Sequence, residues 1–150
     1  MSTPIEVLAD DFVISINTGT EVSPTWTPIQ GLKSHRLGSE TKEVDAANRS
    51  TRGWGQTRSV RRGQTLTMGG NFFEDPDDGA RDPGQAAVET LAEQIMPDDL
   101  GWFCLETPFG ATTYFQATAK MGDVGGDLDS LCEWNATLSM YGAPSATYGS

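Results

Sequence analysis

The amino-acid sequence predicts a mainly β fold, an antiparallel β-sandwich or small barrel with one flanking α-helix and a long extended loop or arm. Segments of strict apolar–polar alternation recur along the 150 residues, and such alternation is typical of strands with one buried face. Seventeen glycines and eight prolines punctuate these segments, as expected for short strands joined by turns. A chain of this length is expected to form a single domain, 1–150, with its own core.

Three strands are predicted before residue 75. Residues 11–17 (DFVISIN) alternate cleanly, and residues 26–32 (WTPIQGL) form a second short strand in which Pro28 favours an edge position. Residues 64–73 (QTLTMGGNFF) alternate again, and Gly70 within them marks a bulge or a bend. One-faced alternation with short connections favours antiparallel pairing.

One helix is predicted from about Pro83 to Met96. Asp82 is the expected N-cap, Pro83 occupies the first helical position, and Gln85 lies three residues after the cap, as in a capping box. Pro97 ends the helix. The apolar residues that share one face at helical spacing are Ala87, Val88, Leu91, Ala92 and Ile95.

Three further strands are predicted after the helix, at 101–106, 112–121 and 131–141. A hairpin connection at 107–110 joins the first two. In the last strand, alternate residues point inward: Cys132, Trp134, Ala136, Leu138 and Met140. The polar residues from about 143 to 150 are expected to form a flexible tail.

The segment at about 37–57 is polar and has almost no apolar period. Loops of this length are usually functional or disordered, and an extended arm or hairpin that orders against a neighbour fits the same pattern. Trp54, between Gly53 and Gly55, is a candidate anchor for an interface. Packing of Trp54 back onto its own domain is an equal alternative.

The net charge of −11 is unevenly distributed. Residues 33–62 hold eight bases and three acids, a net charge of +5, whereas the rest holds two bases and eighteen acids, a net charge of −16. A charge-polarised subunit repels copies of itself in most orientations and attracts them in a few. A solvated basic loop without a partner is the simpler alternative. The strongly acidic whole disfavours nucleic-acid binding by the basic segment.

Motifs for chemistry are sparse. The single histidine, His35, is expected at the surface, and no nucleophile pattern accompanies it. Cys104 and Cys132 are expected as reduced, small buried side chains, although a pairing across strands stays open. Asp75 and Asp77 resemble the start of a calcium loop that lacks its later ligands, so a solvated turn is favoured. We therefore expect no enzyme, no cofactor and no metal site.

No stretch approaches the roughly 20 apolar residues of a membrane span. The N-terminal residues lack the basic and apolar regions of a signal peptide. The chain is therefore expected to be made in a cytosol, without a membrane partner.

The order of short segments along the chain resembles that of the major tail (tail tube) proteins of long-tailed bacteriophages. The resemblance covers nearly the whole chain, and its weight lies in the order rather than in any one motif. The segments are the Trp strand ending in Gly-Leu at 26–32, ETKEVD at 40–45, GWG at 53–55, TLT at 65–67, PFG at 108–110, GGD at 125–127, EW at 133–134 and GAP at 142–144.

The resemblance implies a structural virion protein that self-assembles into stacked, hexameric rings around a lumen. Such rings form the tail tube, the conduit for DNA ejection. The implied partners are copies of the chain itself, the tape-measure protein and other tail proteins, while phage DNA passes without specific binding. The implied location is the virion tail, assembled in the bacterial host cytoplasm. No catalytic residue is carried over, because the family has none.

The arm is expected to meet an acidic face of the next subunit. The candidate interface residues are Arg49, Arg52, Trp54, Arg58, Arg61 and Arg62 on the basic side and Glu74, Asp75, Asp77 and Asp78 on the acidic side. Three alternatives remain from the sequence: a tail terminator, a type VI secretion tube-like subunit, and a monomeric ligand-binding β-sandwich module.

Overall fold

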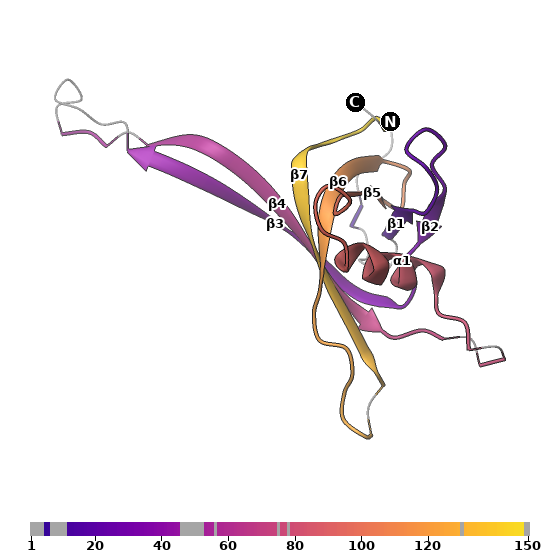
Figure 1. Ribbon diagram of the computed structural model, residues 1–150. Helices are drawn as coiled ribbons and strands as arrows, with labels where there is room; N and C mark the ends of the chain where they lie inside the picture. The colour runs from indigo at the N-terminus through magenta and orange to yellow at the C-terminus, as the bar shows by residue number, and fades with distance from the viewer. Residues whose placement is uncertain are drawn as a thin grey trace.

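The computed structural model describes residues 5–6, 12–45, 53–55, 57–74, 76–77, 79–129 and 131–148. Its strands form one seven-stranded sheet in the order β2-β1-β5-β6-β7-β4-β3, with antiparallel neighbours throughout (Figure 1). The elements are β1 (Val13–Asn17), β2 (Trp26–Pro28), β3 (Leu32–Asp45), β4 (Thr57–Asn71), α1 (Pro83–Ala92), β5 (Gly101–Glu106), β6 (Thr112–Met121) and β7 (Glu133–Ser145). The mainly β class with one helix is confirmed. Among the described residues, the strands form a single open sheet rather than a closed barrel.

The two edge strands of this sheet, β2 and β3, are joined by residues 29–31 alone. This connector is hydrogen-bonded to two strands. Ile29 N donates to Ile14 O of β1 at 2.9 Å, and Asn71 N of β4 donates to Gly31 O at 2.8 Å. Gly70 lets the connector pass close to β4, since a Cβ on Gly70 would lie 2.1 Å from Gly31 O. The strand predicted at 26–32 is therefore wrong for residues 29–31, which form this connector.

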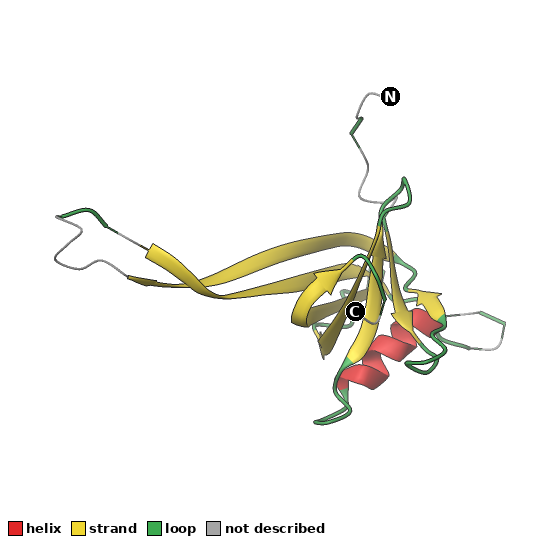
Figure 2. Cartoon of the chain, turned by 90° about the horizontal axis from the view of Figure 1, so that it is seen from above, coloured by secondary structure: helices red, strands yellow, loops and turns green. Residues whose placement is uncertain are grey.

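The core lies between one face of the sheet and α1, which crosses that face (Figure 2). Burying a large apolar side chain stabilises a fold by about 1.5–3 kcal/mol. The largest apolar side chains that are fully or almost fully buried are Trp134, Phe103, Phe115, Leu66, Met68, Leu138 and Val88. Val88 comes from α1, and the others come from alternate positions of β4, β5, β6 and β7, as the period of two predicts.

The start of α1 is as predicted, but Gln85 has a different role. Asp82 Oδ2 accepts a hydrogen bond from Gln85 N at 3.1 Å and so caps the helix. The Gln85 side chain, fully buried, turns away from the cap. Its Nε2 donates to Gln30 O at 2.9 Å and Asn71 O at 2.7 Å, and its Oε1 accepts from Phe73 N at 3.1 Å. One amide thus ties the connector and the end of β4 to the helix.

The helix ends at Ala92, earlier than predicted. Glu93 N and Gln94 N donate to the carbonyls of residues three positions before them, at 3.2 and 3.1 Å. These tighter bonds close the last turn. Ile95, predicted on the apolar face, is instead 81% exposed.

At the C-terminus, β7 continues to Ser145, so the segment predicted as a flexible tail begins with strand residues. Further along, the Tyr148 ring packs against Trp26 and Trp102, with centroids 5.4 and 4.8 Å apart. The Tyr148 hydroxyl donates to Glu21 O at 2.7 Å. These contacts hold the described part of the tail against the β1–β2 end of the sheet.

Candidate subunit interface

The far part of the β3–β4 hairpin projects as a two-stranded ribbon (Figures 1 and 2). We call residues 39–45 and 57–64 the arm. Strand β4 pairs with β7 only from Thr65 to Asn71, so in the arm β4 is paired with β3 alone. The side chains of 39–45 are all exposed. A lone two-stranded ribbon is marginally stable in water, so the arm is suited to gain support from a neighbouring molecule.

Cationic side chains face each other across the arm. Lys42 lies directly opposite Arg61, and Arg62 pairs with Thr41 on one side; on the other side, beyond a bulge, Glu43 pairs with Ser59 and Val44 with Arg58. Like charges directly opposite each other destabilise an isolated antiparallel pair. The arm also holds Glu40, Glu43 and Asp45, so its four cations and three acids leave a net charge of +1, and the β4 side of the arm carries the cations Arg58, Arg61 and Arg62 without an acid.

An acidic loop connects β4 to α1. We call residues 74–80 the acidic loop, of which the structure describes Glu74, Pro76–Asp77 and Gly79–Ala80. Glu74 and Asp77 are exposed. Arg81, at the end of the loop, directs its charge elsewhere, since it bonds Glu89 at 2.8 Å and covers the Phe72 ring at 3.9 Å. The loop thus presents negative charge to the solvent.

The arm and the acidic loop lie at opposite ends of the molecule. Figure 1 and the perpendicular view in Figure 2 both show the arm reaching away from one side of the body and the loop on the other side. Surfaces of opposite sign so placed cannot meet within one chain. Between copies they meet head to tail, which is the geometry of a heterologous contact.

The sheet face opposite α1 carries a row of hydroxyl side chains, which we call the hydroxyl face. The register aligns Thr65 with Ser139 and Thr67 with Thr137 on β4 and β7, and Thr118 on β6 with Ser139. These residues alternate with the buried core positions of the same strands. The helix covers the other face, so the hydroxyl face is open in the single chain.

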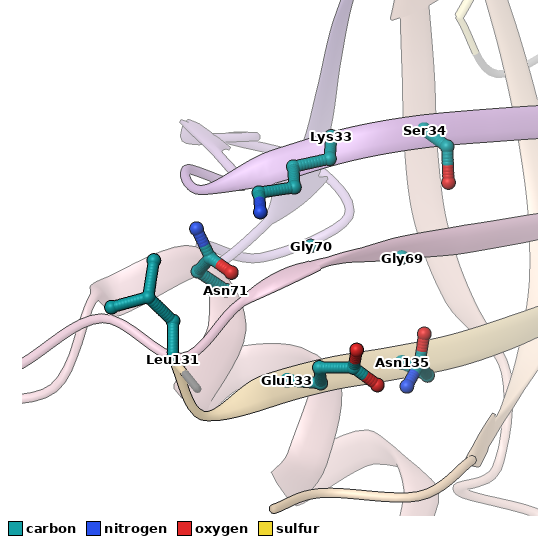
Figure 3. A pocket seen from close by; sticks show the side chains of 8 residues that line it. All are labelled: Lys33, Ser34, Gly69, Gly70, Asn71, Leu131, Glu133 and Asn135. Atoms are coloured by element: carbon teal, nitrogen blue, oxygen red, sulfur yellow. The ribbon is translucent and has the colours of Figure 1, made fainter. Parts of the chain in front are cut away.

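A polar groove crosses the sheet where β3, β4 and β7 run side by side (Figure 3). Its volume is about 330 Å³. Gly69 and Gly70 leave its floor without side chains, while Lys33 extends over one side and Glu133 and Asn135 lie along the other. These side chains can hydrogen-bond a polar group, but they do not form a nucleophile–base pair.

Within the described part of the chain, no group of three His, Cys, Asp or Glu side chains is placed to hold a metal ion. No helix there is long and apolar enough to cross a membrane. His35, predicted at the surface, is half-buried, and its ring contacts Phe12 at a centroid distance of 5.0 Å.

The structure groups the predicted interface residues into two separate sets. Arg58, Arg61 and Arg62 lie together on the arm, and Glu74 and Asp77 lie on the acidic loop. Trp54 follows β3 toward the far end of the hairpin and is 79% exposed. Arg49, Arg52, Asp75 and Asp78 lie outside the described residues.

Two features of this surface were missed by the sequence reasoning. Lys42 completes the basic patch through its pairing with Arg61, and strand register is not visible in composition. The hydroxyl face had a signal, because Thr and Ser alternate with core residues in 65–68 and 136–139.

The two cysteines are free and differ in exposure. Cys104 on β5 is buried, whereas Cys132 is exposed, which contradicts its predicted inward orientation. Strand β6 separates β5 from β7, so the two thiols do not face each other across neighbouring strands. Burial raises the pKa of the Cys104 thiol; a hydrogen bond with Ser15 opposes this rise, and the nearby Glu106 carboxylate adds to it.

We expect a thiol reagent at pH 8 to label Cys132 rapidly and Cys104 slowly, because the thiolate is the nucleophile and Cys104 is both buried and held protonated. Mass spectrometry over time would count the labels. Cys132→Ser should remove the fast phase alone. Equal rates for the two sites would contradict the buried position of Cys104.

No known protein-family model matches the chain, and no curated protein matches it in sequence. Solved structures do match. A chain from the tail of an empty gene transfer agent particle, refined with C6 symmetry, is 19% identical, with a TM-score of 0.67 over 95% of this chain and 99% of that chain. A chain from the virion of a native gene transfer agent particle is 18% identical, with a TM-score of 0.64 over 93% and 98%. The chain thus shares its fold with chains found in such particles.

Proposed function

We propose that this chain is a structural protein of a phage-like tail, and that its copies assemble into stacked six-membered rings that form the tail tube. The observation that carries the proposal is the placement of the arm, whose β4 side carries Arg58, Arg61 and Arg62, and of the acidic loop at opposite ends of one subunit. Heterologous contacts of this kind generate rings when the rotation closes and filaments when it does not. The similar fold of a chain in a C6-symmetric tail supports the ring number.

The hydroxyl face is the proposed wall of the conduit. Its centre carries Thr and Ser side chains, with Lys120 and Arg36 at the two ends of the row through Thr137 and Thr67, and Glu133 farther along β7. DNA binding depends largely on neutralising its phosphates with cations. A wall dominated by Thr and Ser therefore lets DNA pass during ejection without specific binding.

Copies of the chain are the principal partner, and the tape-measure protein and other tail proteins meet the tube in the virion. Assembly takes place in the bacterial host cytoplasm. The chain acts as a building element rather than as an enzyme.

The proposal is tested by light scattering of the purified protein across concentration, combined with negative-stain electron microscopy. We expect tubes or stacked rings above a threshold concentration. Single closed rings that never stack would favour a tail terminator instead. A strict monomer at every concentration would contradict self-assembly and favour a ligand-binding module.

A further inference from the structure

Trp54 is a large aromatic side chain without a local environment that buries it. It is 79% exposed and is flanked by Gly53, whose φ is +87°, and by Gly55. Among the described residues, a Cβ on either glycine would meet nothing within 4 Å. Tryptophan is enriched among the few residues that dominate the binding energy of protein interfaces, where it fills a pocket on the partner.

A pocket of matching character lies beside the acidic loop. It is an open depression with a volume of about 540 Å³, within the range of ligand pockets. Glu74 and Asp82 supply acidic groups to its wall, and Phe73 remains 42% exposed. The apolar side chains that line it are Phe73, Pro76, Ala80 and Pro83.

Hydrogen bonds around α1 fix the part of the pocket wall formed by Phe73 and Asp82. Asp82 is buried and caps the helix, and its Oδ2 also accepts from Gln30 N at 3.2 Å. Gln85 Oε1 accepts from Phe73 N at 3.1 Å and so fixes the backbone of the exposed phenylalanine. A preformed pocket binds with less ordering cost than one that must assemble around its ligand.

Charge complementarity identifies the occupant. Glu74 lines the pocket, as does Arg81, whose charge is paired with Glu89, whereas the hairpin that carries Trp54 also carries Arg58, Arg61 and Arg62. The hairpin points away from the acidic loop of its own chain in both views (Figures 1 and 2). Only a second copy can therefore bring such a tryptophan to this pocket.

We infer that Trp54 of one copy inserts into the pocket of the next copy, against Phe73, while the arm cations lie beside Glu74 and Asp77. The contact is the anchor of the head-to-tail interface. The inference rests on the proposed self-assembly and adds the residues that decide its affinity: an apolar anchor at the centre and charged pairs around it.

Substitution of Trp54 tests the inference. We expect Trp54→Ala to raise the threshold concentration for assembly at least about tenfold, because truncation of an aromatic anchor leaves its pocket unfilled. Trp54→Phe should recover most of the loss. Phe109→Ala, which removes an aromatic ring of similar exposure (74%) from another turn, is the matched control and should leave the threshold unchanged.

Cysteine pairing locates the contact. In a Cys132→Ser background, Trp54→Cys copies mixed with Ala80→Cys copies should form a disulfide-linked heterodimer under mild oxidation. A mixture of Trp54→Cys with Leu128→Cys copies is the control. Leu128 is fully exposed and so accessible to oxidation, but it lies on a different loop, so this mixture should not form the heterodimer.

The two proposals fail in different ways. A wild-type protein that never assembles overturns both. A wild-type protein that forms tubes, with Trp54→Ala assembling at the same threshold and no Trp54–Ala80 cross-link, overturns this inference and leaves the proposed function standing.

Discussion

Replacing Arg58, Arg61 and Arg62 together with glutamate is expected to abolish assembly under conditions in which the wild-type protein forms tubes. The arm then carries negative charge toward the acidic loop of the next copy. Like-charge juxtaposition at an interface costs several kcal/mol, so we expect the threshold concentration to rise at least about 100-fold. Sedimentation velocity and negative-stain electron microscopy would measure the change.

A mixing experiment separates this interface effect from misfolding. A second variant, in which Glu74, Asp75, Asp77 and Asp78 are all replaced by arginine, makes the loop basic and should also fail to assemble alone. In an equimolar mixture, each arm meets a loop of opposite sign on the other variant, so alternating assemblies should form. If the mixture stays unassembled, or if the arginine variant assembles like wild type, the arm does not bind the acidic loop.

Gln85→Leu is expected to have the largest effect on stability. Leucine has a similar size but leaves Gln30 O, Asn71 O and Phe73 N without their partner. A buried polar group left unsatisfied costs about 1–3 kcal/mol, so the free energy of unfolding should fall by about 3–5 kcal/mol. This is a large fraction of the roughly 5–15 kcal/mol that stabilises a typical domain.

Urea denaturation followed by tryptophan fluorescence would measure this loss. Gln94→Leu is the matched control, because Gln94 is exposed beyond the end of the same helix. It should change the free energy of unfolding by no more than about 0.5 kcal/mol. A loss below about 1 kcal/mol for Gln85→Leu would contradict the role assigned to its three hydrogen bonds.

The parts of the fold that follow local patterns are predictable from the sequence. Strands β5 and β6 begin and end at the predicted residues, because their apolar alternation is bounded by turn residues. The helix starts at Pro83 because the preceding Asp82 caps it. Gln85 escaped prediction, since its partners include Gln30, 55 residues away, and only the folded chain brings them together.

The arm shows why part of the interface was beyond sequence reasoning. Both faces of 39–45 are exposed, so this part of β3 lacks the apolar period that marks a strand. Its strand character comes from pairing with β4. The basic and acidic clusters are visible as charges, but their positions at opposite ends depend on the sheet order.

Electron cryomicroscopy of the assembled wild-type protein, with helical reconstruction, tests the account most directly. We predict that the arm of each copy lies on the acidic loop of a copy in the adjacent ring and that the hydroxyl face lines the bore. Rings that contact each other through other surfaces, with the arms free in solvent, would contradict it.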